Sequence, residues 1–116
     1  MDLYHVFFDL KPGITDRVLL EKLAPYMAHL KSNGLIESHR LTRAKLGFGL
    51  KAHGDWHLVL EVKNLAQLEA AFQTVASRRD PVESLHHGVN SLVQNPVFAL
   101  YRDFPDPVRH HGGEKF

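Results

Sequence analysis

Two segments of this 116-residue chain each carry a histidine and a carboxylate four residues apart. His5 and Asp9 occupy the first segment, and His57 and Glu61 occupy the second. In a strand, residues separated by an even number of positions lie on one face of the sheet, so each pair shares a face. Imidazole and carboxylate groups that meet in a small cavity of low dielectric can act as acid or base. These two segments therefore hold the candidate chemistry of the chain.

His57 and His5 are the candidate catalytic residues, because they face each other if the two segments are neighbouring strands. Such a pair would transfer a proton to or from a substrate without a cofactor. Two alternatives remain open: polar side chains paired at a wet seam between subunits, and a facial metal site of two imidazoles and a carboxylate. We assign no metal and no cofactor, and we expect Asp9 and Glu61 nearer the rim because they lie close to strand ends.

Four further side chains are the candidates for substrate binding: Arg40, Glu61, Phe7 and Tyr101. A guanidinium can clamp the carboxylate of an anionic substrate, and a structural salt bridge is the alternative role for Arg40. A buried guanidinium without a partner is costly. We therefore expect a bulge or a twist that turns Arg40 toward the cavity or toward an acidic partner such as Glu61.

The composition and the motifs exclude several kinds of site. The chain has no cysteine, which removes disulfides, thiolate metal sites and cysteine nucleophiles. It contains no G-x-S-x-G nucleophile elbow, which disfavours hydrolase chemistry. The run from Lys45 to Leu50 is close to an RNA-recognition motif, but Leu46 is an extra residue and Leu50 replaces an aromatic one. With a net charge of +1, RNA binding is the weakest hypothesis, and a hairpin flap over the cavity mouth or a partner subunit fits the run better.

Several histidines lie outside the two segments. His86 and His87 are adjacent near a short helix, and adjacent residues on a helix point in different directions, so at most one reaches the cavity mouth. His110 and His111 belong to the C-terminal tail, where we expect them to be solvated.

Hydrophobic periodicity predicts strands at residues 3–10, 35–43, 55–62 and 91–102, with helices over 15–32, from 64 onward and over 80–89. Thr15 or Asp16 can cap the first helix, and Asn64 begins a capping-box pattern. Pro25 should kink or divide the first helix. Pro96 marks the last strand as an edge strand or the site of a bulge.

This order of elements predicts an α+β, ferredoxin-like fold, in which a four-stranded antiparallel sheet carries its helices on one face. We expect one domain over residues 1–104 and a tail over residues 105–116. The other sheet face would expose Leu3, Phe7, Val59, Val97 and Tyr101. A contiguous apolar patch of this kind marks an interface, so we expect a homodimer joined through the open face.

The segment from His5 to Lys11, followed by Pro12-Gly13, resembles the opening of stress-responsive A/B-barrel proteins, a branch of the dimeric α/β-barrel superfamily. Residues 34–37, 41–43 and 98–105 are similar to an uncharacterised bacterial family in that superfamily. The resemblance covers about residues 3–106 and implies two ferredoxin-like subunits whose sheets join face to face. That superfamily includes cofactor-free monooxygenases, haem degraders, lactone isomerases and members without known activity. No catalytic set from those enzymes matches this chain residue by residue.

The leading hypothesis is a small homodimer that binds or converts a small organic molecule in a cavity between sheet and helices. Its chemistry would be of the cofactor-free oxygenase or isomerase type at most. The alternative is a non-catalytic dimer whose open face is only an interface, and RNA binding is third. The chain shows no basic leader and no apolar run of membrane-spanning length, so we expect a cytoplasmic protein without a membrane partner.

Overall fold

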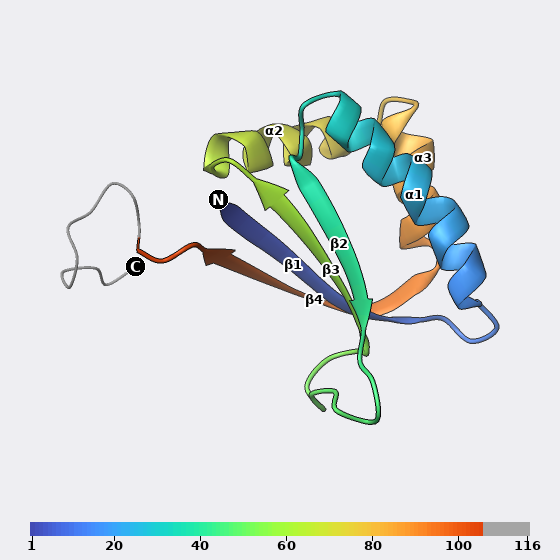
Figure 1. Ribbon diagram of the computed structural model, residues 1–116. Helices are drawn as coiled ribbons and strands as arrows, with labels where there is room; N and C mark the ends of the chain where they lie inside the picture. The colour runs from blue at the N-terminus through green and yellow to red at the C-terminus, as the bar shows by residue number, and fades with distance from the viewer. Residues whose placement is uncertain (106–116) are drawn as a thin grey trace.

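The computed structural model describes residues 1–105, and the remainder of the predicted tail, with His110 and His111, lies outside them. The elements follow the order β-α-β-β-α-α-β (Figure 1). Their bounds are β1 (Asp2–Leu10), α1 (Asp16–Ser32), β2 (Ser38–Arg43), β3 (Trp56–Val62), α2 (Leu65–Ala76), α3 (Val82–Asn90) and β4 (Val93–Arg102).

The strands form one antiparallel sheet in the order β2-β3-β1-β4, so β1 lies in the middle and pairs with both β3 and β4. All three helices lie on one side of this sheet, and its other side is open (Figure 1). The predicted ferredoxin-like α+β fold is confirmed. No helix within residues 1–105 is long and apolar enough to span a bilayer.

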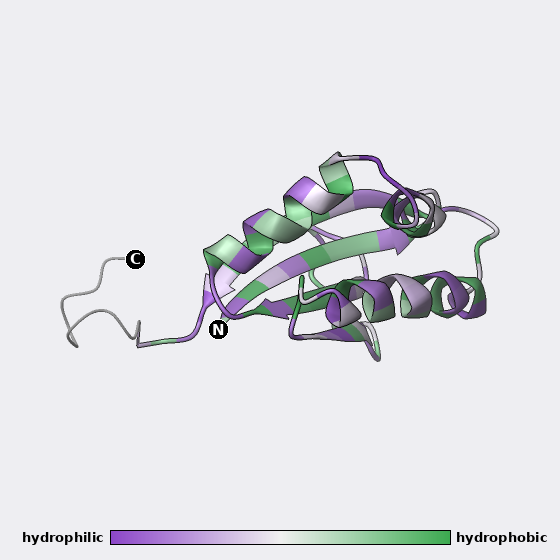
Figure 2. Ribbon diagram, turned by 90° about the horizontal axis from the view of Figure 1, so that it is seen from above, coloured by the Kyte–Doolittle hydropathy of each residue, from purple (hydrophilic) through white to green (hydrophobic). Residues whose placement is uncertain are grey.

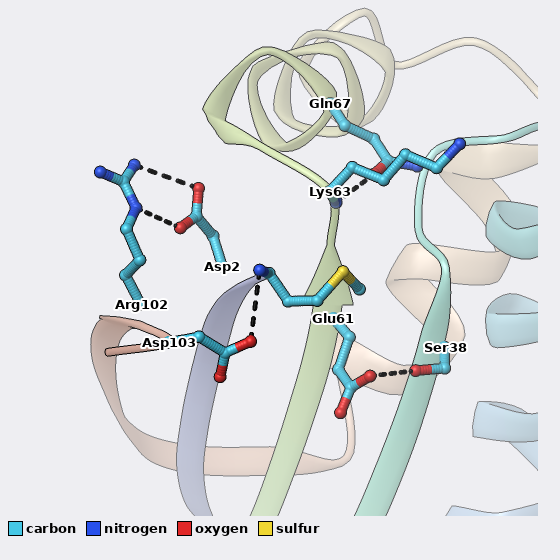
Figure 3. Close-up of polar contacts among 8 residues, drawn as sticks. Asp2, Ser38, Glu61, Lys63, Gln67, Arg102 and Asp103 are labelled. Carbon is cyan, nitrogen blue, oxygen red and sulfur yellow. Dashed lines mark hydrogen bonds and ion pairs between the residues drawn. The ribbon is translucent and has the colours of Figure 1, made fainter. Parts of the chain in front are cut away.

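Two polar side chains, those of Thr15 and Asn64, cap the N-termini of α1 and α2. The Oγ1 atom of Thr15 accepts a hydrogen bond from Val18 N at 3.3 Å and caps α1. Asn64 caps α2 by accepting from Gln67 N at 3.0 Å, and the Gln67 side chain accepts in turn from Lys63 N at 2.7 Å (Figure 3). Both caps satisfy backbone donors that a helix start leaves without partners.

The first helix tolerates a proline in its interior. α1 runs from Asp16 to Ser32 through Pro25, so the predicted division of this helix is not observed. Proline removes one backbone hydrogen bond of the helix. Burial of a continuous stripe against the sheet compensates for that loss; its members are Leu19, Leu23, Tyr26, Met27 and Leu30.

The two edge strands depart from the prediction in different ways. β2 begins at Ser38, later than predicted, because the preceding backbone is still bonded to the end of α1, with Leu35 N donating to Leu30 O. β4 shifts its pairing with β1 at the position of Asn95 and Pro96, where Asn95 has a φ of +54°. The predicted irregularity at Pro96 is therefore confirmed.

Alternation along the strands separates the two sheet faces (Figure 2). Tyr4 and Phe8 of β1, with Leu58 of β3, point toward the helices. His5 and His57 point to the open side. The buried core between sheet and helices consists of Phe8, Leu19, Leu23, Tyr26, Met27, Leu30, Ile36, Leu58, Leu60, Val62, Leu68 and Val82.

An ion pair fastens the start of β1 to the end of β4 (Figure 3). Asp2 is only 3% exposed, and Arg102 Nε donates to its Oδ1 at 2.6 Å while a second guanidinium nitrogen donates to Oδ2 at 3.3 Å. The N-terminal ammonium of Met1 pairs with Asp103 at 3.3 Å. These contacts hold the outer end of β4 on the sheet where no helix covers it.

Candidate functional site

A pocket of about 400 Å³ lies between the sheet and the helices. Its floor consists of side chains from the strands, and its walls come from all three helices. The lining residues are Tyr4, Val6, Phe8, Leu23, Tyr26, Met27, Leu30, Leu58, Leu60, Leu68, Ala71, Phe72, Val75, Ala76, His86, Val89, Asn90, Val93, Pro96 and Phe98. A hollow of this volume with a mainly apolar lining has the character of a small-molecule site.

Four polar side chains contribute to this lining: Tyr4, Tyr26, His86 and Asn90. The rings of Tyr26 and His86 meet edge to face, with 5.9 Å between their centroids. Burial, with the nearby Tyr4 hydroxyl adding, raises the pKa of Tyr26 to about 12. Tyr26 is therefore a hydrogen-bond donor at neutral pH and not a base.

The chemistry of the pocket follows from these groups. None of its lining residues is Asp, Glu, Lys or Arg, so an ionic ligand would lose its hydration without gaining a charged partner. A mainly apolar molecule with one or two oxygen or nitrogen atoms would instead find a phenol, an imidazole and an amide. The neutral His86 ring carries one nitrogen that donates a hydrogen bond and one that accepts it.

The predicted catalytic pair lies on the opposite face of the sheet. His5 Nδ1 and His57 Nε2 are 2.8 Å apart, so one ring donates a hydrogen bond to the other. The two rings are nearly parallel, at 12°, with 5.1 Å between centroids. The expectation that these histidines face each other across neighbouring strands matches this geometry.

Aromatic rings surround this pair. Phe7 lies directly across from His57 in the strand register, with the two ring centroids 4.2 Å apart. His53 stacks on the other side of Phe7 at 3.9 Å, and Tyr101 meets His5 edge to face at 4.9 Å. We call these five residues the histidine cluster.

Burial weakens the basicity of the cluster. It lowers the pKa of His5, and it lowers the pKa of His57 together with the charges of His5 and His53. His5 Nε2 is buried and has no hydrogen-bond partner among the described residues. Both effects favour neutral imidazoles at this position.

Arg40 and Glu61 do not meet. β2 pairs with β3 in regular register, which places Arg40 opposite Val59 on the open face without the predicted bulge. Arg40 is exposed, and Glu61 instead accepts a hydrogen bond from Ser38 Oγ at 2.8 Å (Figure 3). Arg40 thus lies on the open side, as expected, but it does not pair with Glu61, because an edge strand leaves this guanidinium in water.

The six predicted site residues and the pocket thus occupy opposite faces of the sheet. His5, Phe7, Arg40, His57, Glu61 and Tyr101 lie on the open side. The pocket groups Tyr4 and Tyr26 were not among the predicted site residues, although strand alternation and the apolar stripe of α1 both place them on the inward side. His86 lines the pocket and His87 does not, which agrees with the expectation that at most one of them reaches it.

The part of the chain that the structure describes contains no group of three or more His, Asp or Glu side chains placed to hold a metal ion. The carboxylate of Asp9 accepts a hydrogen bond from Asp55 N at 3.4 Å instead of one from the histidine cluster. The facial arrangement considered from the sequence is thus not assembled among residues 1–105.

Comparison with known proteins gives a family and a fold. The profile of a family of unknown function, DUF6614, matches residues 1–116. No curated protein matches the chain.

Solved structures resemble the chain over nearly its whole length. SnoaB, a cofactor-independent oxygenase from Streptomyces nogalater, has a TM-score of 0.68 at 8% identity, covering 93% of this chain and 97% of that one. The Arabidopsis thaliana protein At3g17210 has a TM-score of 0.66 at 10% identity, with coverages of 89% and 95%. A dimeric ferredoxin-like protein of unknown function from Jannaschia sp. CCS1 has a TM-score of 0.64 at 10% identity, with coverages of 89% and 100%. At such identities the likeness shows the ferredoxin-like fold alone.

Proposed function

Because this chain belongs to the family of unknown function DUF6614, we propose its function from its own geometry: it binds a small, mainly apolar organic molecule in the pocket between sheet and helices. We propose further that it does so as a homodimer whose subunits meet through the open sheet face. One observation carries the first proposal. The sheet and the helices leave about 400 Å³ between them, although the surrounding core is well buried.

The polar atoms of the pocket support this proposal. A void in a protein core forfeits packing energy, so a chain gains nothing from keeping one empty. Tyr26, His86 and Asn90 add hydrogen-bonding groups to the otherwise apolar lining. A phenol that stays protonated and an imidazole beside it suit a ligand with a carbonyl or hydroxyl oxygen.

The open face supports the homodimer. Val97 is 42% exposed and Tyr101 is 62% exposed there, beside the partly buried Phe7 and Val59. Neighbours with this fold include proteins described as dimeric. Burying the face against a second copy would remove this apolar surface from water.

Any conversion of the bound molecule would use the pocket groups. We propose proton transfer at His86 with Tyr26 as hydrogen-bond donor, a reaction type that needs no cofactor. A cofactor-independent oxygenase shares the fold, which makes such chemistry compatible with this architecture. The histidine cluster cannot reach a molecule in the pocket because the sheet separates them.

For the histidine cluster itself we propose a structural role at the subunit interface. Its two imidazoles bond each other and stack on aromatic rings, which is the arrangement of a packed subunit seam. The catalytic role of His57 and His5 stays a prediction. His57→Ala tests it: loss of turnover in an intact dimer would favour catalysis, and a change in stability alone would favour the seam.

The pocket is tested by titration with a neutral fluorescent dye, N-phenyl-naphthylamine. Val75 lines the pocket and Thr74 does not, yet the two are adjacent on α2, similar in size and equally buried. Val75→Phe should abolish dye binding by filling the pocket, whereas Thr74→Phe should leave it unchanged. Equal binding by both variants, with both folded by circular dichroism, would show that the dye binds elsewhere and would overturn the proposal.

A further inference from the structure

We infer that the hydroxyl groups of Tyr4 and Tyr26 form a two-donor site for one oxygen atom of the ligand, which makes the ligand a neutral ketone or aldehyde with an apolar body. This inference rests on the proposed pocket and adds which atoms recognise the bound molecule. It concerns binding alone and does not depend on any reaction of the ligand.

The two tyrosines enter the pocket from opposite layers. Tyr4 lies on the helix-facing side of β1, and Tyr26 belongs to the buried stripe of α1 that faces the sheet. Both side chains line the pocket. Burial raises the pKa of both phenols, and an interaction with Tyr4 adds to the raised pKa of Tyr26. The two hydroxyls therefore lie close enough to interact, and both keep their protons at neutral pH.

The protein itself does not use these hydroxyls. Among residues 1–105, neither the Tyr4 hydroxyl nor the Tyr26 hydroxyl has a hydrogen-bond partner. Tyr26 is only 9% exposed, and a tyrosine hydroxyl at such a buried position normally has a partner. Two donors left free at the wall of one cavity indicate a ligand atom between them, or a water molecule that the ligand displaces.

The hydrogen-bonding capacity of the lining defines the ligand class. A carbonyl oxygen has two lone pairs and can accept a hydrogen bond from each hydroxyl. A hydrocarbon would leave both hydroxyls dehydrated and unpaired, which costs binding energy. A carboxylate would bring a full charge into a lining that contains no Lys or Arg. A neutral ketone or aldehyde avoids both penalties.

Aromatic rings hold Tyr4 in place and leave apolar surface for the rest of the ligand. Phe72 meets the Tyr4 ring edge to face at 5.2 Å, and Phe98 lies nearly parallel to it at 6.0 Å. Both phenylalanines also line the pocket, and they are 44% and 57% exposed. Because these contacts already order the Tyr4 side chain, its hydroxyl needs little further ordering when a ligand binds.

Two probes of the same shape test the site: 2-acetylnaphthalene, which has one carbonyl group, and 2-ethylnaphthalene, in which a methylene group replaces it. Each probe displaces the dye N-phenyl-naphthylamine in a titration. Tyr4→Phe and Tyr26→Phe should each weaken binding of 2-acetylnaphthalene by about three- to tenfold, because one hydrogen bond is lost. Both variants should bind 2-ethylnaphthalene as well as the wild-type protein or better, because the removed hydroxyl is no longer left unpaired.

The matched control is Tyr101→Phe, which removes the same group from the open face of the sheet, where Tyr101 contacts His5. It should leave the affinities of both probes unchanged. The infrared stretching band of the probe's carbonyl group gives a second readout, since hydrogen-bond donors lower its frequency. For 2-acetylnaphthalene bound to the wild-type protein, the band should lie below its position in hexane, and it should rise in Tyr4→Phe and in Tyr26→Phe.

The outcomes separate this inference from the proposed pocket. If Val75→Phe abolishes dye binding but the ratio of the two probe affinities is unchanged in Tyr4→Phe and Tyr26→Phe, the carbonyl site is overturned and the pocket stands. A carbonyl band at the hexane position in the wild-type protein would also overturn the carbonyl site, without any variant. A changed ratio in Tyr101→Phe would place the probe on the open face and contradict the inference. Unimpaired dye binding by Val75→Phe would overturn both proposals.

Discussion

Histidine has two distinct environments in this protein. His86 lines an apolar pocket beside a phenol, whereas His5 and His57 bond each other on the far side of the sheet. From sequence, strand alternation correctly placed His5 and His57 on one face. The same reasoning could not rank His86 above His87, because the choice depends on how α3 is rotated against Tyr26 of α1.

The His5–His57 pair should make stability depend on pH. Both pKa values are lowered in the folded protein, so the unfolded chain binds more protons as the pH falls through about 6.5. The free energy of unfolding should therefore be highest above that value and decline between about pH 7 and pH 5, a range that lies above ordinary carboxyl titration. His57→Gln should flatten this decline in urea denaturation.

His87→Gln is the control for that measurement, since His87 is exposed on α3 and outside the cluster. It should keep the decline of the wild-type protein. A wild-type free energy that stays constant or rises on acidification would contradict the assignment of neutral imidazoles to the pair.

At the scale of the elements, a close approach between the backbones of Gly54 and β1 constrains the fold. Gly54 packs against β1 where no Cβ fits, while Gly88 in α3 has only the Lys22 side chain nearby, at 3.8 Å. Gly54→Ala should destabilise the protein by about 2 kcal/mol or more, because the backbone of β1 must shift. Gly88→Ala should stabilise it by about 0.5–1 kcal/mol by lowering the entropy of the unfolded chain. Paired urea denaturation curves measure both, and equal effects would refute the close approach.

The ion pair between Asp2 and Arg102 at the end of the sheet should also contribute to stability. Arg102→Gln leaves the buried carboxylate of Asp2 without its charged partner and should cost about 1–3 kcal/mol. Arg17→Gln removes an exposed pair with Glu21 on α1 and should change stability by no more than about 0.5 kcal/mol. Similar midpoints for these two variants in thermal unfolding would mean that the Asp2 contact contributes little.

The elements themselves were largely predictable from local signals. Thr15 and Asn64 begin α1 and α2 as expected, and Pro96 accompanies a shift in pairing. Pro25 does not divide α1 because tertiary burial of the α1 stripe outweighs one lost hydrogen bond. The Glu61 partner of Arg40 was wrong because Ser38 lies directly opposite Glu61 in the register of β2, which the segment from Leu35 onward does not specify.

At the scale of the whole molecule, the position of the pocket could not be predicted from the sequence. Its volume is the space left between α1, α2, α3 and the sheet, which depends on side-chain sizes in elements distant in sequence. Strand alternation predicts which residues face the helices, but it does not predict whether they fill the gap. The open apolar face was predictable from the sequence because a single layer of helices covers only one side of the sheet.

The proposed association through the open face predicts that a charge placed there separates the subunits. Val59 is opposite His5 in the middle of the sheet. Val59→Lys would bury two ammonium groups near a twofold axis and should yield folded monomers in sedimentation at micromolar concentration. Leu20→Lys, an exposed site on α1, should leave the dimer unchanged. A dimer that survives Val59→Lys would place the interface elsewhere.

The proposed ligand site lies between sheet and helices rather than on the face with the histidine cluster. A crystal structure of the protein grown with N-phenyl-naphthylamine tests this location most directly. We expect the dye inside the pocket beside Tyr26 and His86, with two subunits packed through their open faces. Dye bound against His5 and His57, or a pocket closed by its own side chains, would contradict it.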